Sequence, residues 1–275
     1  MHRFHRWAGI AGVLILFVFS AYAKTLQHPF RWVDDEDFKP LIYRNAEGAS
    51  KGIFYDVITE VFKRMKIPLE NRLYPWSRAQ KIVLDGDGDG MVTIYTEARK
   101  KLFKATDPIL TVEEHVFTSR NNPKLNTILN IRSLDELEKF IIVDTIDSGW
   151  SRENLKGMHV IWVPTAKSAL NMIALQRADI YLMNDFTGPY FIKEQIEKNS
   201  PFRDQLREIV MGYYPIATMD YRLLIRKDSP YVDIIEQFNK VLRQMHKDGT
   251  FQKIVNRYKI DMRYKANQRP RKCHE

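Results

Sequence analysis

The sequence predicts a mixed α/β protein, on three observations. Short apolar segments typical of strands alternate along the chain with amphipathic segments typical of helices, and this order favours an α/β architecture. The chain has 275 residues, enough for one large domain or two lobes of ordinary size. Its single cysteine, Cys273, excludes an internal disulfide, so we expect the fold to be stabilised by burial of a hydrophobic core.

The first 23 residues show the three-part pattern of a cleaved secretory signal. Arg3 and Arg6 are followed by an uncharged apolar run at 8–20, and Ala21-Tyr22-Ala23 supplies the small residues that a signal peptidase reads. We expect cleavage before Lys24, export to the periplasm and a soluble mature protein. A membrane anchor is the alternative, but the apolar run is shorter than the roughly 20 residues that cross a bilayer.

The basic excess of the chain is dilute except at its C-terminal end. Net charge is +9, and +7 without Arg3 and Arg6. We interpret 265–275 as a disordered basic tail, because frayed termini are common and export makes nucleic acid an improbable partner. The clustered basic residues at this end are Arg263, Lys265, Arg269, Arg271 and Lys272.

Strand and helix patterns can be followed in order through the first half of the mature chain. An apolar run at 30–33 predicts a first strand. A glycine opens an amphipathic helix at 52–66, which places Val57, Val61, Phe62 and Met65 on one face. The further elements expected in this half are a short helix at 78–84, a strand at 91–95 and an extended segment at 111–120.

The second half continues the alternation. Ser133, with Asp135 and Glu136 after it, predicts the start of a helix. A long helix is expected at 229–248, ended by Gly249. The remaining expected elements are strands at 141–144, 159–163, 180–183 and 221–226 and a helix at 166–176.

Sequence signatures of covalent or metal catalysis are absent. The chain has no G-x-S-x-G elbow, no Walker loop and no H-E-x-x-H pair, and its seven histidines are scattered. Gly86 and Gly88 lack the third glycine of a dinucleotide loop, because Met91 stands at that position. We therefore expect no catalytic residues, no bound metal and no cofactor.

The run Asp85-Gly86-Asp87-Gly88-Asp89-Gly90 matches the first half of a calcium-binding loop. The twelfth position of such a loop supplies a bidentate glutamate, and here it is Thr96, with Glu97 one residue late. The strongest ligand is therefore missing. We interpret this run as a polar turn between a helix and a strand.

Several further motifs appear in a fixed order, and together they resemble the family 3 extracellular solute-binding proteins, the polar-amino-acid receptors of ABC transporters. Each is loose alone, but their combined order and spacing are fairly specific, and the resemblance covers nearly all of 30–260. The motifs are Gly52-Ile53-Phe54-Tyr55-Asp56, Pro75-Trp76-Ser77-Arg78-Ala79, Leu84-x-Gly86-x-x-Asp89, Thr96-Glu97-Ala98-Arg99, Ala105-Thr106-Asp107-Pro108-Ile109, Arg226-Lys227-Asp228-Ser229-Pro230 and Lys247-Asp248-Gly249-Thr250-Phe251.

The resemblance implies a two-lobed periplasmic-binding-protein fold of type II, with the lobes joined by two hinge strands near 111–120 and 210–221. The first lobe would comprise 24–110 and 220–264, and the hinge and second lobe 111–219. A small ligand would bind in the cleft and the lobes would close by hinge motion. The implied partner is the membrane permease of an ABC transporter, and we expect a monomer.

The resemblance also implies a set of ligand-binding residues. Arg99 occupies the place of the arginine that grips the ligand carboxylate, for which a guanidinium is suited by its two parallel hydrogen bonds. The alternative is a solvated surface arginine. The other implied residues are the aromatic walls Trp76 and Phe38, the hydroxyl donors Thr93, Tyr95 and Thr96, and the turn Ser148-Gly149-Trp150, whose backbone N–H groups suit an anion.

Two departures from the family pattern affect the expected ligand. Amino-acid binders carry an aspartate five residues beyond the one that corresponds to Asp179, and it pairs with the ligand ammonium. Here that position is Asn184, with Asp185 one further, and a slip of one residue exchanges the two faces of a strand. The stretch from Asp89 to Arg99 is also two residues shorter than in the lysine- or histidine-type receptors. We therefore expect a small carboxylate-bearing molecule, which need not be an α-amino acid.

Two other functions stay open on the same fold. Some relatives are periplasmic dehydratases of prephenate or arogenate, and such a site needs a general acid, for which the sequence offers no well-supported candidate. The chain could also present its ligand to a membrane sensor kinase rather than to a transporter.

Overall fold

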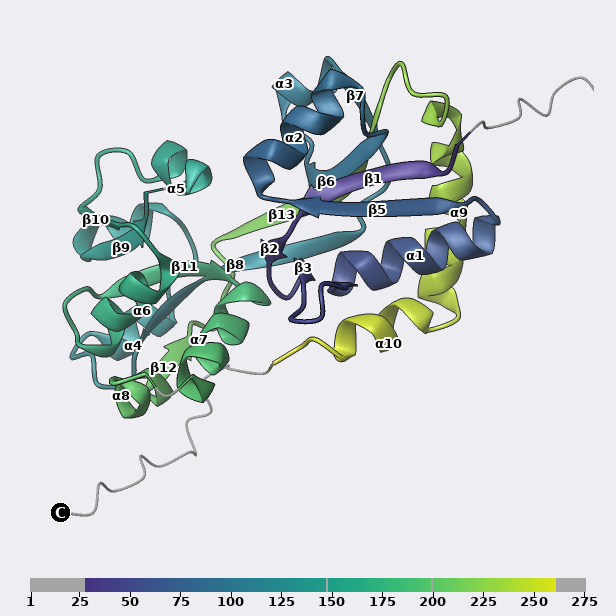
Figure 1. Cartoon of the computed structure of the whole chain (residues 1–275). Coiled ribbons are helices and arrows are strands. Elements are labelled where there is room, and N and C mark those ends of the chain that lie inside the picture. Colours follow the sequence, from purple (N-terminus) through teal and green to yellow (C-terminus); the bar gives the residue numbers. More distant parts are fainter. Residues whose placement is uncertain (1–27, 147, 199, 261–275) are drawn as a thin grey trace, which may run out of the picture.

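The computed structural model describes residues 28–146, 148–198 and 200–260. The expected signal peptide and basic tail lie outside these residues. A ten-stranded sheet runs through the described chain in the order β10-β9-β11-β8-β13-β6-β1-β5, with β12 on β8 and β7 on β13 (Figure 1). Its strands are β1 (Phe30–Asp35), β5 (Leu69–Tyr74), β6 (Gly90–Ile94), β7 (Phe103–Ala105), β8 (Leu110–Ser119), β9 (Ile142–Thr145), β10 (Val160–Val163), β11 (Ile180–Asn184), β12 (Ile209–Met211) and β13 (Ala217–Arg226).

The first lobe is a layered unit around β1, β5, β6 and the C-terminal half of β13. Helices α1 (Ile53–Met65), α9 (Ile235–Lys247) and α10 (Thr250–Asn256) cover one face of its sheet, and α2 (Trp76–Asp85) covers the other. A small second sheet is made by β2 (Asp37–Phe38), β3 (Ile42–Arg44) and β4 (Ser50–Lys51), and the short helix α3 (Glu97–Lys100) follows β6.

Helix α1 begins where the sequence predicts, and Gly52 explains why. Gly52 has φ of +119°, and a Cβ there would lie 2.5 Å from the carbonyl oxygen of Leu41. Only glycine fits such a backbone approach. Val57, Val61, Phe62 and Met65 are buried on one face of the helix, as their helical spacing predicts.

The second lobe is built around the parallel strands β9, β10 and β11. One face packs against the helices α6 (Ala166–Ala174), α7 (Thr187–Glu197) and α8 (Arg203–Arg207). The other packs against α4 (Leu125–Leu129), the 3-10 helix η1 (Asp135–Lys139) and the end of α5 (Gly149–Asn154). Each face therefore has its own hydrophobic core, as expected for a sheet covered by helices on both sides.

Two strands belong to both lobes. β8 and β13 pair antiparallel with each other from Leu110 to Glu114 and from Ala217 to Tyr221. Beyond that stretch β8 continues along β11 and β12, whereas β13 continues along β6 and β7. The predicted two-lobed α/β fold, joined by two hinge strands, is thereby confirmed. The residue boundaries of the lobes stay a prediction.

Two helix predictions are wrong in detail. The segment after Ser133 forms a 3-10 helix rather than an α-helix, and the Ser133 hydroxyl bonds to the Glu136 carboxylate instead of capping backbone N–H groups. The late helix α9 begins at Ile235, not at Ser229, after a short 3-10 turn η2 (Val232–Ile234). The Ser229 hydroxyl is held by the Asp89 carboxylate at 3.0 Å, which fixes this segment outside the helix.

The acidic run at 85–90 forms the predicted turn between α2 and β6, and its carboxylates go to different partners. Asp85 bonds to Lys81, Asp87 is exposed, and Asp89 is buried. The Asp89 carboxylate accepts the backbone N–H of Arg31 at 2.9 Å and its Nε–H at 3.2 Å. Within residues 28–260, apart from 147 and 199, no group of three or more acidic, histidine or cysteine side chains is arranged to hold a metal ion. None of the helices described is long and apolar enough to cross a membrane.

Asp89→Ala should lower the free energy of unfolding by about 3 kcal/mol, because it leaves Arg31 and Ser229 without their buried acceptor. Urea unfolding measures this loss. Asp87→Ala, two residues away but exposed, is the matched control and should change stability by less than about 0.5 kcal/mol. A calcium chelator should leave the melting temperature of the wild type unchanged, and a fall of several degrees would contradict our interpretation of the run as a polar turn.

Candidate functional site

Arg99 lies in the first lobe, close to where β6 meets β13, and is fixed by neutral acceptors. Its Nη1 donates to the Thr93 hydroxyl and to the carbonyl of Ile94, each at 2.9 Å, and its Nη2 donates to Oε1 of Gln80 at 3.1 Å. Thr96 caps the one-turn helix α3 on which Arg99 sits. These contacts hold the guanidinium in one orientation.

The positive charge of Arg99 is uncompensated. The side chain is half-buried, and this burial lowers its pKa, while the Tyr221 phenol acts in the opposite direction. Among the residues described, no carboxylate acts on its pKa. A desolvated guanidinium without a carboxylate partner is suited to bind an anion.

The two expected aromatic walls belong to the cores on opposite faces of the first-lobe sheet. The ring of Trp76, at the start of α2, lies 5.9 Å from the Arg99 guanidinium carbon and packs on the core beneath α2. Phe38, on β2, packs against Tyr221 with ring centroids 5.7 Å apart. The structure therefore brings Trp76 to Arg99 directly, and Phe38 only to Tyr221.

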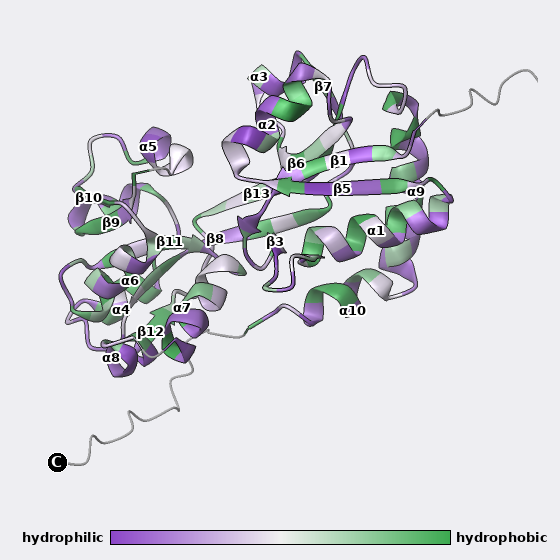
Figure 2. Ribbon diagram, in the orientation of Figure 1, coloured by the Kyte–Doolittle hydropathy of each residue, from purple (hydrophilic) through white to green (hydrophobic). Residues whose placement is uncertain are grey.

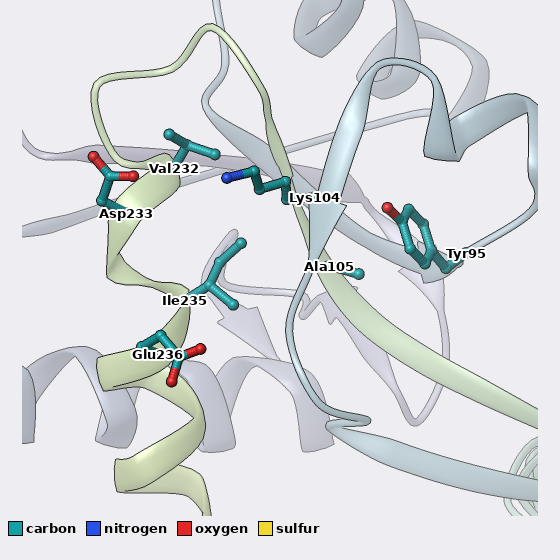
Figure 3. A pocket seen from close by; sticks show the side chains of 7 residues that line it. All are labelled: Tyr95, Lys104, Ala105, Val232, Asp233, Ile235 and Glu236. Atoms are coloured by element: carbon teal, nitrogen blue, oxygen red, sulfur yellow. The ribbon is translucent and has the colours of Figure 1, made fainter.

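Tyr95 lines a cavity of its own in the first lobe. Its hydroxyl donates to the carbonyl of Phe103 at 3.0 Å. Figure 3 shows the ring at one side of this cavity, with β7 and the start of α9 forming the rest of it. The cavity has a volume of about 390 Å³ and is lined by Tyr95, Lys104, Ala105, Val232, Asp233, Ile235 and Glu236, all of the first lobe. Tyr95 is thus not gathered with Arg99, whereas Thr93 is.

The expected turn of the second lobe caps a helix. The Ser148 hydroxyl accepts the N–H of Ser151 at the start of α5 and donates to the Ser151 hydroxyl, which in turn donates to Asp144. Gly149 has open space where a Cβ would stand, and Trp150 packs against the core of this lobe. Ser148 and Gly149 are therefore positioned at a helix start, while Trp150 serves as packing.

Asn184 and Asp185 are both committed to backbone groups. The Asn184 side-chain oxygen accepts the N–H groups of Phe186 and Thr187, at 3.1 and 2.8 Å, and so caps α7. One oxygen of Asp185 accepts the N–H of Glu113 on β8 at 3.0 Å, and burial raises the pKa of this carboxyl. The Asn184 oxygen is therefore engaged at the start of α7, whereas Asp185 is engaged through one of its two oxygens.

Glu114 is a buried carboxyl at the lobe junction that the sequence analysis missed. It lies at the centre of β8, opposite Asn184 of β11 and Ala217 of β13, where the two crossing strands join the lobes. Its side chain is 9% exposed. Burial, with repulsion from Asp144 and Asp185, raises its pKa to about 8. Its burial could have been predicted from the sequence, because Glu114 falls in the same alternating pattern along β8 as the buried Val112 and Val116.

Tyr221 connects the two charged groups. Burial raises the pKa of its phenol, the Glu114 carboxylate raises it further, and the Arg99 guanidinium lowers it. The phenol therefore experiences both charges. Tyr221, on β13 opposite Ile94 of β6, is thus a residue whose pKa is affected both by Arg99 of the first lobe and by Glu114 of the crossing strands.

Side chains of the two lobes also contact each other away from the crossing strands. Lys39 of the first lobe lies 3.7 Å from the Glu194 carboxylate on α7, and the rings of Tyr43 and Tyr190 lie 6.4 Å apart. A cavity of about 340 Å³ opens beside them, lined by Tyr43, Tyr190, Lys193, Glu194, Glu197, Arg257, Tyr258 and Ile260.

Comparison with known proteins agrees with the fold. The family model of the bacterial extracellular solute-binding proteins, family 3, matches residues 30–261. No curated protein matches the chain in sequence.

Among solved structures, a histidine kinase sensor domain with similarity to periplasmic binding proteins has a TM-score of 0.65 at 20% identity, covering 85% of this chain and 96% of that one. Substrate binding domain 2 of GlnP from Lactococcus lactis, in its open conformation, has a TM-score of 0.61 at 19% identity, covering 84% and 94%. An ancestral arginine-binding protein bound to arginine has a TM-score of 0.62 at 19% identity, covering 85% and 99%.

Glu114→Gln should stabilise the empty protein increasingly as pH rises. A carboxyl whose pKa is raised on folding favours the native state while it is protonated, and this stability is lost from its unfolded pKa up to about 8. The gap in free energy of unfolding between variant and wild type should therefore widen from pH 5 to pH 8, by at most about 1.4 kcal/mol per pH unit. Urea unfolding across this range measures it, and a gap that stays constant would contradict the assignment.

Proposed function

The chain belongs to family 3 of the bacterial extracellular solute-binding proteins, and we propose that it captures a small carboxylate-bearing ligand, an amino acid or related organic acid, between its two lobes. The single observation that carries this proposal is Arg99, a half-buried guanidinium held by three neutral acceptors with no carboxylate acting on it among the described residues. Thr93 and the carbonyl of Ile94 engage Nη1, and Gln80 engages Nη2 once, so we propose that the edge formed by Nε and Nη2 grips the ligand carboxylate.

Binding is proposed to proceed by hinge closure about β8 and β13. These strands connect the lobes, and bending at a few of their residues would bring the start of α5 toward Arg99. Backbone N–H groups at that helix start and the Arg99 side chain would then face the ligand from both lobes. Closure removes water around the ligand, which strengthens each of these polar contacts.

The proposed setting is the periplasm, with the permease of an ABC transporter as the partner that receives the ligand. This rests on the family, on the amino-acid receptors among the similar structures, and on the signal pattern of the first 23 residues. The likeness to a histidine kinase sensor domain supports a second candidate, in which the closed protein reports its ligand to a membrane sensor. Uptake of labelled ligand by cells with and without the gene separates the two.

We also propose that the protein is not an enzyme and acts as a monomer. The alternative is a dehydratase, which needs a general acid. Glu114, a buried carboxyl with a raised pKa, is a candidate for that role which the sequence analysis did not offer, so the alternative has to be tested. Conversion of prephenate or arogenate by the purified protein would therefore favour the enzyme over the receptor.

Export gives a direct expectation for the mature chain. The protein recovered by osmotic shock should begin at Lys24, because Ala21-Tyr22-Ala23 ends a short apolar run. N-terminal sequencing or intact mass measures this, and a membrane-bound protein that keeps Met1 would contradict it.

Arg99→Ala should weaken ligand binding by at least about thirtyfold, since loss of one side of a desolvated charge pair costs about 2 kcal/mol or more. Arg99→Lys should recover only part of this loss, because an ammonium lacks the planar pair of donors. Calorimetry with the ligand found in a thermal-shift screen of amino acids, di-acids and aromatic acids measures both.

The matched control is Arg78→Ala, an exposed arginine on α2 that lies over the ring of Tyr74. It should bind the ligand as the wild type does. Equal affinities for the wild type, Arg99→Ala and Arg78→Ala would show that Arg99 is only a surface residue.

A further inference from the structure

The carboxyl ends of β1 and β6 lie at a switch point in the sheet of the first lobe. β5 lies on one side of β1 and β6 on the other, so the connection through α1 leads away to β5 and the connection through α2 carries the chain back past β1 to β6 (Figure 1). In open α/β sheets, ligands bind in the crevice outside the carboxyl ends of two such strands. Arg99 follows β6 at this end of the sheet.

β1 and β6 separate before they reach this end. β1 pairs with β5 along its whole length, but it pairs with β6 only at Trp32, opposite Gly90. The same parallel register would next set Asp34 opposite Val92. The backbones are not paired there, and the N–H of Val92 donates instead to Oδ2 of Asp34 at 2.8 Å. A side-chain carboxylate thus replaces a backbone acceptor between the two strands.

Asp34 is held in this position by its own contacts. The residue is 2% exposed, and its two carboxylate oxygens accept three N–H groups. Besides Val92, Oδ2 accepts the indole N–H of Trp32 at 2.7 Å, and Oδ1 accepts the backbone N–H of Asp35 at 2.9 Å. Burial raises the pKa of this carboxyl to about 7, and the three donors act in the opposite direction. Removal of the carboxylate would leave buried donors without an acceptor, which is costly.

Val92 leads directly to the groups that hold Arg99. The next two residues of β6 are Thr93 and Ile94, whose hydroxyl and carbonyl oxygens accept from Nη1 of Arg99, each at 2.9 Å. On the side of β13 the strand β6 is paired throughout, and on the side of β1 it is held at this end by Asp34. A displacement of the end of β6 would therefore move both acceptors of Arg99 together.

We propose that Asp34 is a positioning residue for Arg99. Its carboxylate fixes the carboxyl end of β6 at a set spacing from β1, and so determines where Thr93 and Ile94 hold the guanidinium. The inference rests on the proposed function, because the buried Asp34 acts on the ligand only through Arg99. A carboxylate that merely stabilises the lobe would change the free energy of unfolding without changing the position of Arg99.

The experiment compares the wild type with Asp34→Asn, Asp34→Ala and Asp89→Ala at pH 8, where the Asp34 carboxyl is largely ionised. Asparagine keeps one oxygen for the N–H of Val92, so this conservative variant should lie between the wild type and Asp34→Ala. Asp89→Ala is the matched control. It removes an equally buried carboxylate of the same lobe, one that binds Arg31 and Ser229 and precedes β6.

Hydrogen exchange followed by NMR reports on the end of β6. In Asp34→Ala the Val92 amide should exchange at least about tenfold faster relative to the core amides of α1, because it loses a charged acceptor. The increase should be smaller in Asp34→Asn. In Asp89→Ala the ratio should stay that of the wild type, although the whole lobe is less stable.

Phenylglyoxal, which modifies accessible guanidinium groups, reports on Arg99 in the empty protein. Cleavage after lysine gives the peptide 82–100, in which Arg99 is the only arginine. Its modification should be several times faster in Asp34→Ala than in the wild type, and intermediate in Asp34→Asn, because the guanidinium is released from its acceptors. Arg78, which is exposed on α2, is the internal control and should react alike in all four proteins.

Calorimetry with the L-amino acids and succinate as probes measures the effect on binding. A probe that binds the wild type should bind Asp34→Ala at least about tenfold more weakly, because a misplaced binding group loses its contact even when the displacement is small. Asp34→Asn should recover part of this loss, and Asp89→Ala should bind as the wild type does.

Unchanged Val92 exchange or Arg99 modification in Asp34→Ala, or equal changes in Asp89→Ala, would overturn the proposal. Equal affinity of the wild type and Asp34→Ala for a bound probe would do the same. If Asp34→Ala does not fold, Asp34→Asn decides by the same measures, and no shift in it contradicts the proposal. If no probe binds, or if Arg99→Ala binds its probe normally, the proposed function fails and the role of Asp34 in binding with it. Exchange and modification separate that outcome from a failure of the positioning itself.

Discussion

The antiparallel pairing of β8 with β13 is the constraint on which the rest of the structure depends. Both strands are ten residues long, and only their overlapping halves pair with each other. The same register sets Tyr221 opposite Ile94, whose carbonyl holds Arg99, and sets Glu114 between Asn184 and Ala217. A shift of one residue would turn Glu114 to the opposite face, so the backbone register decides that a carboxyl is buried at the lobe junction.

Much of the fold was predictable because its elements have clear periodicity. α1 and β6 carry apolar residues at helical and strand spacing, and both lie close to the predicted ranges. β5 was missed because it is an edge strand whose middle residues are polar, Glu70, Asn71 and Arg72, as Figure 2 shows. α7 was missed because Gly188 and Pro189 in its first turn resemble a loop.

The candidate site was predictable only in part, because residue type does not show which bonds a side chain already makes. Arg99 and Thr93 lie together as the family pattern implies, but Asn184 caps α7 and the Tyr95 hydroxyl is bonded to the Phe103 carbonyl. Glu114 follows another glutamate in the sequence, and Glu113 is partly exposed while Glu114 is buried. The difference arises because β11 and β13 flank β8 in one particular register, with Asn184 and Ala217 opposite Glu114. That register cannot be read from a single sequence.

The path of β13 also affects the order in which the chain can fold. The first lobe needs β13 between β8 and β6, yet the whole second lobe precedes β13 in the sequence. The sheet of the first lobe therefore stays incomplete until residue 226 has been synthesised, whereas β9, β10, β11 and their helices are already available. Folding should thus begin with the middle of the chain, and the early segment that carries Arg99 would wait with its apolar strands uncovered. Such a segment is exposed to aggregation until β13 arrives, and a chaperone that covers apolar strands would protect it.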